Sequence, residues 1–330
     1  QKKGSSYFGL CPFHNEKSPS FSVSPGKQIY YCFGCGAGGN VISFVMQYEN
    51  YTVQEAVKFL AKKAGIQLPE AEYSEETRKK ENKRARLLQV NKEAATYFFH
   101  QLRSENGRAG WQYLKKRELS DETIRKFGLG FANMTSNDLV KFLKSKGYED
   151  EVIRDAGLAT FDEKFGFHDK FWNRVMFPIQ DINHRVIGFG GRVMGDGKQK
   201  YLNSPETPVF DKSRNLYGLN IARTARKTQI ILCEGYMDVI TMHQAGFSQA
   251  VASLGTAFTE GQASLLKRYT DEVILSYDSD GAGVTAALRA ISILKEAGMT
   301  GRVLNLEPYK DPDEFIKNCG QEAFQKRLDG

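Results

Sequence analysis

The sequence contains no hydrophobic run long enough to cross a membrane. A membrane-spanning helix needs roughly 18–20 consecutive apolar residues, and no segment of this chain approaches that length. Its first residues also lack the basic and apolar regions of a secretory signal peptide. We therefore expect a soluble cytoplasmic protein with no membrane partner.

Cysteine is scarce as well, with 5 in 330 residues. Three of them cluster with a histidine near the N-terminus, which indicates metal binding rather than a disulfide framework. No Walker A motif exists, and Gly188-x-Gly190-Gly191 lacks the full dinucleotide fingerprint. These absences argue against a disulfide-stabilised secreted protein, a P-loop ATPase and a dehydrogenase.

What the chain does have is length and positive charge. A chain of 330 residues exceeds one ordinary domain, so two or three are expected. The formal net charge of +7 makes a polyanionic partner plausible, although charge alone does not identify one.

Shifts in composition divide the chain into four expected segments. They are a zinc-ribbon module at 1–70, a charged helical linker and entry helix at 71–107, a mixed α/β basic subdomain at 108–215, and a sheet-and-helix subdomain at 216–330. The linker carries six basic side chains between residues 78 and 86. Such a run fits either a solvated helix face or direct DNA contact.

Helices and strands are expected in a definite order. In the N-terminal module, helical patterns cover 41–47 and 52–64, and several short helices follow at 108–158. Strands are expected at 175–179 and 186–189, with a long loop at 190–215, where such a loop is usually functional or disordered. Buried apolar strands then alternate with helices, which predicts a doubly wound parallel sheet. These later strands are Gln229–Cys233, Ala250–Leu254, Glu272–Tyr277 and Arg302–Leu306.

The cysteine cluster has the spacing of a zinc site. Cys11-Pro-Phe-His14 and Cys32-Phe-Gly-Cys35 are two paired-ligand turns separated by seventeen residues. Two such turns supply four ligands to one tetrahedral ion, and four protein ligands leave no open position. We therefore expect one structural zinc ion.

Aromatic residues surround this predicted zinc site, and Lys17 and Lys27 lie nearby. Aromatic rings beside lysines suit stacking on single-stranded bases. The same rings could instead form the small core of the module, and the sequence leaves both possibilities open. The residues concerned are Phe13, Phe21, Tyr30, Tyr31 and Phe33.

Acidic residues follow three of the predicted strands. The carboxyl ends of parallel strands meet in one crevice, where several carboxylates would repel one another unless cations neutralised them. Oxygen ligands of this kind suit magnesium, and a pair of ions can promote phosphoryl displacement. The predicted ligands are Glu234, Asp278, Asp280, Asp311 and Asp313, with Asp238 as a further candidate on the following helix.

A basic stretch lies just before this predicted crevice. From residue 192 to residue 227 there are eight basic residues against three acids, which suits a groove for a nucleic-acid backbone or a triphosphate. The candidate contacts are Arg192, Lys200, Asn203 and Lys212. A simple surface role is the alternative for each.

Taken together, these motifs resemble the bacterial replicative DNA primases. The two Cys/His turns resemble the family's zinc-binding domain. The segments 174–178, 188–192 and 200–208 resemble the basic part of its polymerase domain. Glu234-Gly-Tyr-Met-Asp238, Tyr277-Asp-Ser-Asp280 and Asp311-Pro-Asp313 resemble its TOPRIM metal-binding fold.

The resemblance implies an activity and its partners. The family makes short RNA primers on single-stranded DNA from nucleoside triphosphates. It implies that Glu234, Asp278 and Asp280 are catalytic and that the five acids hold Mg²⁺ or Mn²⁺. It also implies that the basic residues hold template, nucleotide and the primer–DNA hybrid. A replicative helicase would bind a C-terminal domain absent from this chain, which we expect to be a monomeric fragment lacking both ends of the family pattern.

Two other classes of protein remain as alternatives. One is another TOPRIM enzyme, a topoisomerase or nuclease, which also pairs a Glu with an Asp-x-Asp. The other is a zinc-dependent single-strand-binding module without catalysis. Template-dependent RNA synthesis, strand cleavage, and binding with neither would distinguish the three.

Overall fold

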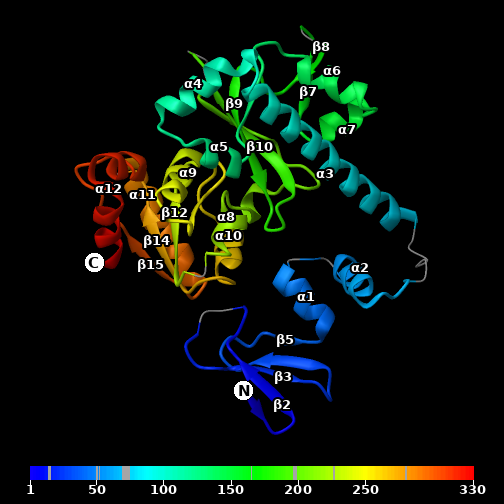
Figure 1. The fold of residues 1–330 in the computed structure, drawn as a ribbon, viewed down its shortest axis with the longest axis vertical. Coiled ribbons are helices and arrows are strands. Elements are labelled where there is room, and N and C mark those ends of the chain that lie inside the picture. Colours follow the sequence, from blue (N-terminus) through cyan, green and yellow to red (C-terminus); the bar gives the residue numbers. More distant parts are fainter. Residues whose placement is uncertain are drawn as a thin grey trace.

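The computed structural model describes residues 1–13, 16–49, 51, 53–68, 75–164, 166–195, 199–225, 227–278 and 281–330, with the backbone alone for 75–78. Figure 1 shows the N-terminal module at one end of the molecule, α3 (Glu75–Leu102) running along the mixed subdomain, and the parallel sheet beside the C-terminus. None of the described helices is both long and apolar enough to span a bilayer.

The N-terminal module is an antiparallel sheet followed by two helices. Its strands lie in the order β1 to β5, and Phe21 and Tyr30 stack at 5.3 Å in its small core. By contrast, Tyr31 is 46% exposed and Phe33 70%. The aromatic residues thus divide between a core role and an exposed surface. The elements are β1 (Lys2–Lys3), β2 (Ser6–Gly9), β3 (Phe21–Ser24), β4 (Ile29–Cys32), β5 (Gly38–Gly39), α1 (Val41–Glu49) and α2 (Val53–Ala64).

Helix α3 is both connector and core element. The apolar side chains of its second half are buried in the mixed subdomain, including Leu87, Val90, Ala94 and Phe98. Its basic stretch also contacts that subdomain. Lys83 pairs with Asp155 at 2.6 Å, Arg84 donates to the Pro208 carbonyl, and Arg86 lies over the Tyr148 ring. For these three basic side chains the contacts favour packing over DNA binding.

The mixed subdomain combines short helices with the antiparallel sheet β11-β10-β9-β6. The prediction of short helices at 108–158 is confirmed. The prediction of one long loop at 190–215 is wrong, because β10 continues to Val193 and β11 follows. The elements are η1 (Glu105–Gly107), α4 (Arg108–Lys116), α5 (Asp121–Lys126), β6 (Gly130–Ala132), α6 (Asp138–Ser145), α7 (Asp150–Asp155), β7 (Ala159–Asp162), β8 (Gly166–Asp169), β9 (Arg174–Gln180), β10 (Val186–Val193), β11 (Tyr201–Asn203) and η2 (Lys212–Arg214).

A four-stranded parallel sheet in the order β13-β12-β14-β15 forms the C-terminal subdomain. The predicted doubly wound parallel sheet is confirmed, and β12 has the predicted bounds. Its central strands consist mainly of buried hydrophobic residues, as expected for strands that are covered on both faces. The elements are α8 (Leu219–Ala222), β12 (Gln229–Cys233), α9 (Tyr236–Gln244), β13 (Ala250–Ala252), α10 (Glu260–Leu266), β14 (Glu272–Ser276), α11 (Gly281–Glu296), β15 (Thr300–Val303) and α12 (Pro312–Asp329).

One buried cluster joins the mixed subdomain to the parallel sheet, running from Leu114 and Phe177 to Ile231 and Phe324. Gly190 permits the close approach at this junction, since a Cβ there would lie 2.5 Å from the ring of Tyr236. Because only glycine fits against that ring, β10 can pack directly on α9. The two subdomains therefore share one core.

The N-terminal module contacts the rest of the chain through an ion pair. The guanidinium of Arg185, in the turn between β9 and β10, lies 2.8 Å from a carboxylate oxygen of Glu55 on α2. It also pairs with Asp181 at 2.7 Å within its own turn. Both partners hold the Arg185 side chain, so the turn presents a fixed positive charge to α2.

Candidate metal centres

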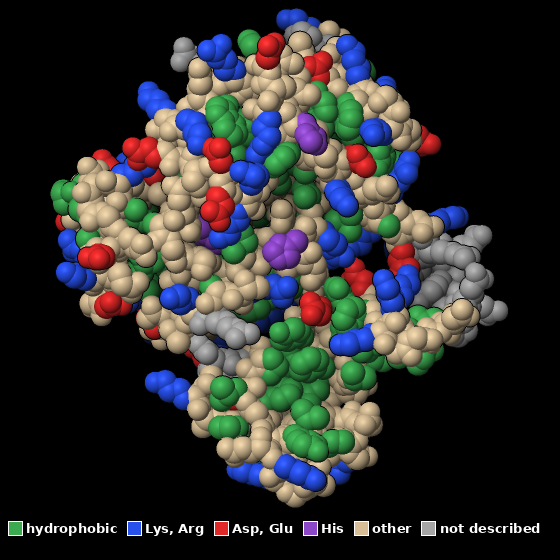
Figure 2. Space-filling model, viewed as in Figure 1, with side chains coloured by type: hydrophobic (Ala, Val, Ile, Leu, Met, Phe, Trp, Pro, Cys, Tyr) green, Lys and Arg blue, Asp and Glu red, His purple; other side chains and the backbone are tan. Residues whose placement is uncertain are grey.

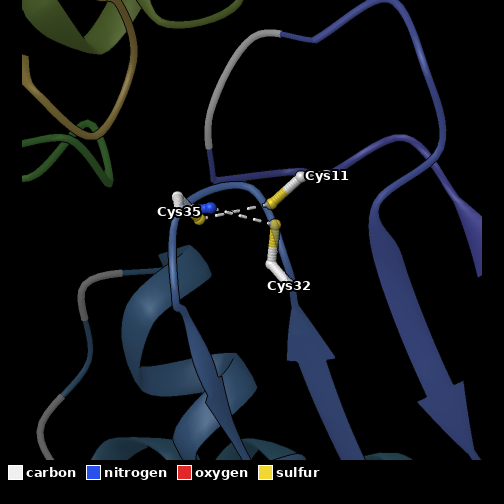
Figure 3. Close-up of side chains that lie close together, drawn as sticks. All are labelled: Cys11, Cys32 and Cys35. Carbon is white, nitrogen blue, oxygen red and sulfur yellow. Dashed lines mark hydrogen bonds between the residues drawn. The ribbon is translucent and has the colours of Figure 1, made fainter.

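Three cysteine thiols of the N-terminal module point toward one another (Figure 3). The Sγ atoms of Cys11, Cys32 and Cys35 all lie within 4.8 Å, and those of Cys11 and Cys35 are 3.8 Å apart. Two sulfurs bound to one tetrahedral zinc at about 2.3 Å each are about 3.8 Å apart. The donor set and the spacing therefore fit a zinc ion. His14, the fourth predicted ligand, lies outside the described residues.

The strands and turns around the thiols favour the thiolate form of one of them. Burial alone would raise the pKa of Cys32, but hydrogen bonds from the Ser20 hydroxyl and the Cys35 backbone N–H lower it below the usual value. The thiolate is the form that binds a metal. Burial raises the pKa of Cys35 instead. A bound cation would offset that effect.

Acidic side chains gather at the carboxyl end of the parallel sheet. In the sheet, Cys233 pairs with Ser276, so Glu234 and Asp278 leave adjacent strands side by side. A carboxylate oxygen of Glu234 accepts a hydrogen bond from the Asp278 backbone N–H at 3.0 Å. Asp280 lies outside the described residues. The predicted convergence of strand ends therefore holds for Glu234 and Asp278.

The pKa of Asp238 is sensitive to the negative charge of this acidic edge. Burial raises the pKa of its carboxyl to about 8, and repulsion from Asp311, Asp278 and Asp313 adds to the effect. A hydrogen bond from the Gly235 backbone N–H opposes the rise only in part. A divalent cation would reverse this balance, since it favours ionised carboxylates. The field is that of a site suited to cations.

Asp311 and Asp313 occupy different environments although they are two residues apart. Asp311 caps α12, with one oxygen accepting the Glu314 backbone N–H at 2.8 Å. Asp313 is only 3% exposed. Its oxygens accept from the Thr241 hydroxyl at 2.8 Å and lie 2.8 and 3.0 Å from the nitrogens of Arg117 and Lys317, respectively.

Not all the predicted acids form a tight ligand group. Across the part of the chain that the structure describes, the three cysteines are the one group of at least three Cys, His, Asp or Glu whose ligand atoms lie within 4.8 Å of one another. The described carboxylates interact at longer range. Mg²⁺ usually retains several waters and takes only one or two carboxylates, so a looser arrangement of oxygens suits it.

Gly283 forms one wall of the acidic edge. A Cβ at this position would lie 2.1 Å from the Asp278 carbonyl oxygen and 2.9 Å from a carboxylate oxygen of Glu234. Real atoms never approach so closely, and the nearer atom is backbone that cannot rotate away. Glycine at this position lets the first turn of α11 pack against the backbone of Asp278 and the side chain of Glu234.

We expect Gly283→Ala to displace the acidic edge and to lower the free energy of unfolding by about 1–3 kcal/mol, the usual cost of overpacking. Urea unfolding and Mn²⁺ binding would measure the two effects. Gly281→Ala is the matched control, because a Cβ on Gly281 meets no atom within 4 Å. Equal behaviour of the two variants would contradict the packing seen around Gly283.

The predicted basic contacts divide into engaged and exposed side chains. Arg192 lies over the Tyr113 ring at 4.2 Å and donates to the Val193 carbonyl. Lys200 is exposed and Lys212 is half-buried. Asn203 uses both ends of its amide, accepting from the Tyr236 hydroxyl at 2.7 Å and donating to the Leu254 carbonyl at 3.0 Å. The Asn203 amide therefore joins β11 to the parallel-sheet subdomain.

Arg117 is a residue that the sequence analysis missed. It follows α4, far from the acids in sequence, yet it pairs with Asp313. It also contributes to the electrostatic surroundings of Tyr113 and Tyr201. No local motif marks it, because its partner lies almost two hundred residues further along the chain.

Comparison with known proteins assigns the chain to a family. Three family models match the chain. The CHC2 zinc finger family matches residues 1–76, and the Toprim-like family matches residues 231–316. Between them, the family described as the N-terminal domain of the DNA primase catalytic core matches residues 97–223. The Aquifex aeolicus primase structure, comprising zinc-binding and RNA polymerase domains, is 38% identical with a TM-score of 0.69. The match covers 100% of this chain and 79% of that one. The chain belongs to the bacterial DNA primase family.

Other primases agree with this assignment. A DNA primase of Clostridium acetobutylicum is 49% identical over 330 residues, which are 100% of this chain and 55% of that protein. A structure of the DnaG primase catalytic domain bound to ssDNA is 39% identical, with a TM-score of 0.70, and the match covers 75% of this chain and 79% of that one. The chain spans about half the length of the curated primases it matches. The predicted resemblance and fold class are confirmed, and the zinc-finger match agrees with the cysteine geometry.

Proposed function

We propose that this chain synthesises short RNA primers on single-stranded DNA by nucleotidyl transfer. The observation that carries the proposal is the contact between Glu234 and the Asp278 backbone at the carboxyl end of the parallel sheet, in a member of the primase family. The relative bound to ssDNA supports a single-stranded template. Nucleoside triphosphates are the matching substrates.

We propose that Glu234, Asp278, Asp280 and Asp311 hold two Mg²⁺ or Mn²⁺ ions. Such ions would activate the primer 3′-hydroxyl for attack on the α-phosphate and stabilise the departing pyrophosphate. The protein keeps Glu234 in place through the Asp278 N–H, and keeps Asp311 in place through its cap on α12. Asp313 was predicted as a ligand. With three donors on its oxygens, we now assign it to positioning the start of α12.

The basic residues have two proposed roles. We assign Arg192, Lys200 and Lys212 to the phosphates of template, primer–DNA hybrid and incoming nucleotide, where lysines and arginines neutralise charge. Asn203, whose amide is held between Tyr236 and Leu254, positions β11 for them. The exposed Lys200 reaches solvent most freely among the described residues of this set.

The N-terminal module has a proposed recognition role. A structural zinc ion bound by Cys11, His14, Cys32 and Cys35 would hold its strands together. Hydrophobic side chains gather on this module in Figure 2. The exposed rings of Tyr31 and Phe33 lie 5.1 Å apart, and such rings stack on unpaired bases. We propose that this surface reads the template while the parallel-sheet subdomain performs the chemistry.

We retain the four segments 1–70, 71–107, 108–215 and 216–330 as functional units. We propose a monomer acting in the cytoplasm at the bacterial replication fork. We also propose that the whole protein contacts the replicative helicase.

One assay tests the proposed function. The zinc-loaded chain is incubated with single-stranded DNA, all four NTPs and Mg²⁺ or Mn²⁺, and the products are separated by length. We expect template-dependent RNA oligomers. Strand cleavage without synthesis would instead support another TOPRIM enzyme, and tight binding with neither would support a single-strand-binding module.

A further inference from the structure

Among the described residues, ion pairs join three cationic side chains to carboxylates at the acidic edge of the sheet. Arg117 and Lys317 both pair with Asp313, whereas Lys310 Nζ lies 3.4 Å from a carboxylate oxygen of Asp278. These ion pairs therefore involve two different described carboxylates. Only Asp278 belongs to the proposed metal ligands.

The pairs around Asp313 share a buried carboxylate, although the side chains of Arg117 and Lys317 are 36% and 27% exposed. The Asp313 side chain is 5% exposed, and the Thr241 hydroxyl completes its set of donors. Removing one member of a buried pair leaves an uncompensated charge, which strongly destabilises a protein. A metal ion could not displace Arg117 and Lys317 without that cost.

The pair at Asp278 is of a different kind. The Lys310 side chain is 63% exposed and that of Asp278 is 23% exposed. Exposed ion pairs are weak because water screens them. A lysine ammonium sits on a flexible four-carbon stem, so an exposed one can change its position and its partners.

We propose that Lys310 is an internal counter-ion that a divalent metal must displace from Asp278. The ammonium reduces the repulsion of the acidic edge while no metal is present, and it competes with the metal for the same carboxylate. Lys310 is thus a positioning residue, and this inference rests on the proposed metal-binding role of Asp278.

The proposal predicts that substituting this lysine strengthens the binding of divalent ions. Lys310→Met removes the competitor and one positive charge, so the affinity for divalent ions rises. We expect a tightening of about two- to five-fold, the factor that corresponds to an exposed ion pair. The gain shrinks at high ionic strength, because salt screens exposed charges.

The experiment is a Mn²⁺ titration of the zinc-loaded chain, followed by electron paramagnetic resonance of the free ion. Wild type, Lys310→Met, Asp278→Asn and Lys326→Met are compared at low and high KCl. Lys326 is an exposed lysine near the far end of α12 and controls for the loss of one charge. Circular dichroism verifies that each variant is folded.

Tighter Mn²⁺ binding by Lys310→Met alone, diminishing with KCl, supports the proposal. Unchanged or weaker Mn²⁺ binding by Lys310→Met overturns it. An equal gain in Mn²⁺ affinity for Lys326→Met also overturns it, because the loss of any positive charge would then explain the effect. Asp278→Asn tests the underlying site separately. If that variant binds Mn²⁺ as wild type does, the proposed metal site fails, whatever Lys310 does.

Discussion

Replacing Glu234 with glutamine is expected to lower primer synthesis at least about 100-fold, the scale on which losing one electrostatic contact to a transition state acts. The amide keeps the size of the side chain but removes the charge that would hold a divalent ion beside Asp278. Its oxygen can still accept the Asp278 backbone N–H, so the fold should persist. Gel analysis of radiolabelled RNA products measures the loss. The double variant with Asp278→Asn and Asp280→Asn should lose synthesis to the same extent as Glu234→Gln.

Template binding separates a catalytic defect from a structural one. We expect the Glu234→Gln chain to bind single-stranded DNA within about two-fold of wild type, because backbone phosphates are contacted by basic side chains. Glu260→Gln, an exposed acid on α10, provides a control with the same chemical change. Wild-type synthesis by Glu234→Gln would remove this residue from the catalytic site.

Zinc removal should unfold the N-terminal module and leave the remainder of the chain folded. The buried cluster of the module's sheet is small, with Cys11, Phe21, Tyr30 and Cys32, and the described part of its two helices adds Val45, Ala56 and Ala61 as buried hydrophobic residues. A structural zinc contributes roughly 10–16 kcal/mol in small zinc modules, far more than so small a core can supply. Hydrogen exchange after chelation should show loss of protection in β3 and β4, with β12 and β14 still protected.

A cysteine variant offers the same test without a chelator. Cys32→Ser should reproduce the exchange pattern of the metal-free chain, since Cys32 is fully buried within the thiol cluster. Cys319→Ser is the control, because Cys319 is exposed and outside that cluster. Retained protection of β3 and β4 after metal loss would mean that side-chain packing alone holds the module.

Periodic features of the chain could be predicted well from sequence. The parallel strands are continuous apolar runs between helices, and β12 falls where it was expected. Helix α3 also follows from a stretch without proline or glycine. Its burial did not follow, because the basic residues at its start suggested a solvated linker. The apolar positions from Leu87 onward enter a core that only the folded chain defines.

The predicted loop at 190–215 is wrong at its start, where β10 continues to Val193. The glycines of β10 suggested the start of a loop, since glycine usually weakens a strand. In the structure Gly190 lies within the strand, opposite Phe177 on β9, and makes room for Tyr236. Close packing against a distant ring leaves no local signal in the sequence.

The candidate sites show the same limit. Acids that end parallel strands and cysteines at fixed spacing are local patterns, so Glu234, Asp278 and the thiol cluster could be located. The partners of Asp313 could not, because Arg117 reaches it from another subdomain. Asn203 was chosen for its place in a basic stretch, yet its amide is occupied by Tyr236 and Leu254.

The contact between Gly190 and Tyr236 limits which side chains this chain can accept at either position. Any side chain at position 190 would collide with the ring unless residue 236 were replaced by a smaller one. A smaller residue 236 would in turn deprive Asn203 of its hydroxyl partner. Three positions from two subdomains are thus coupled, so a substitution at one of them changes which side chains fit at the other two.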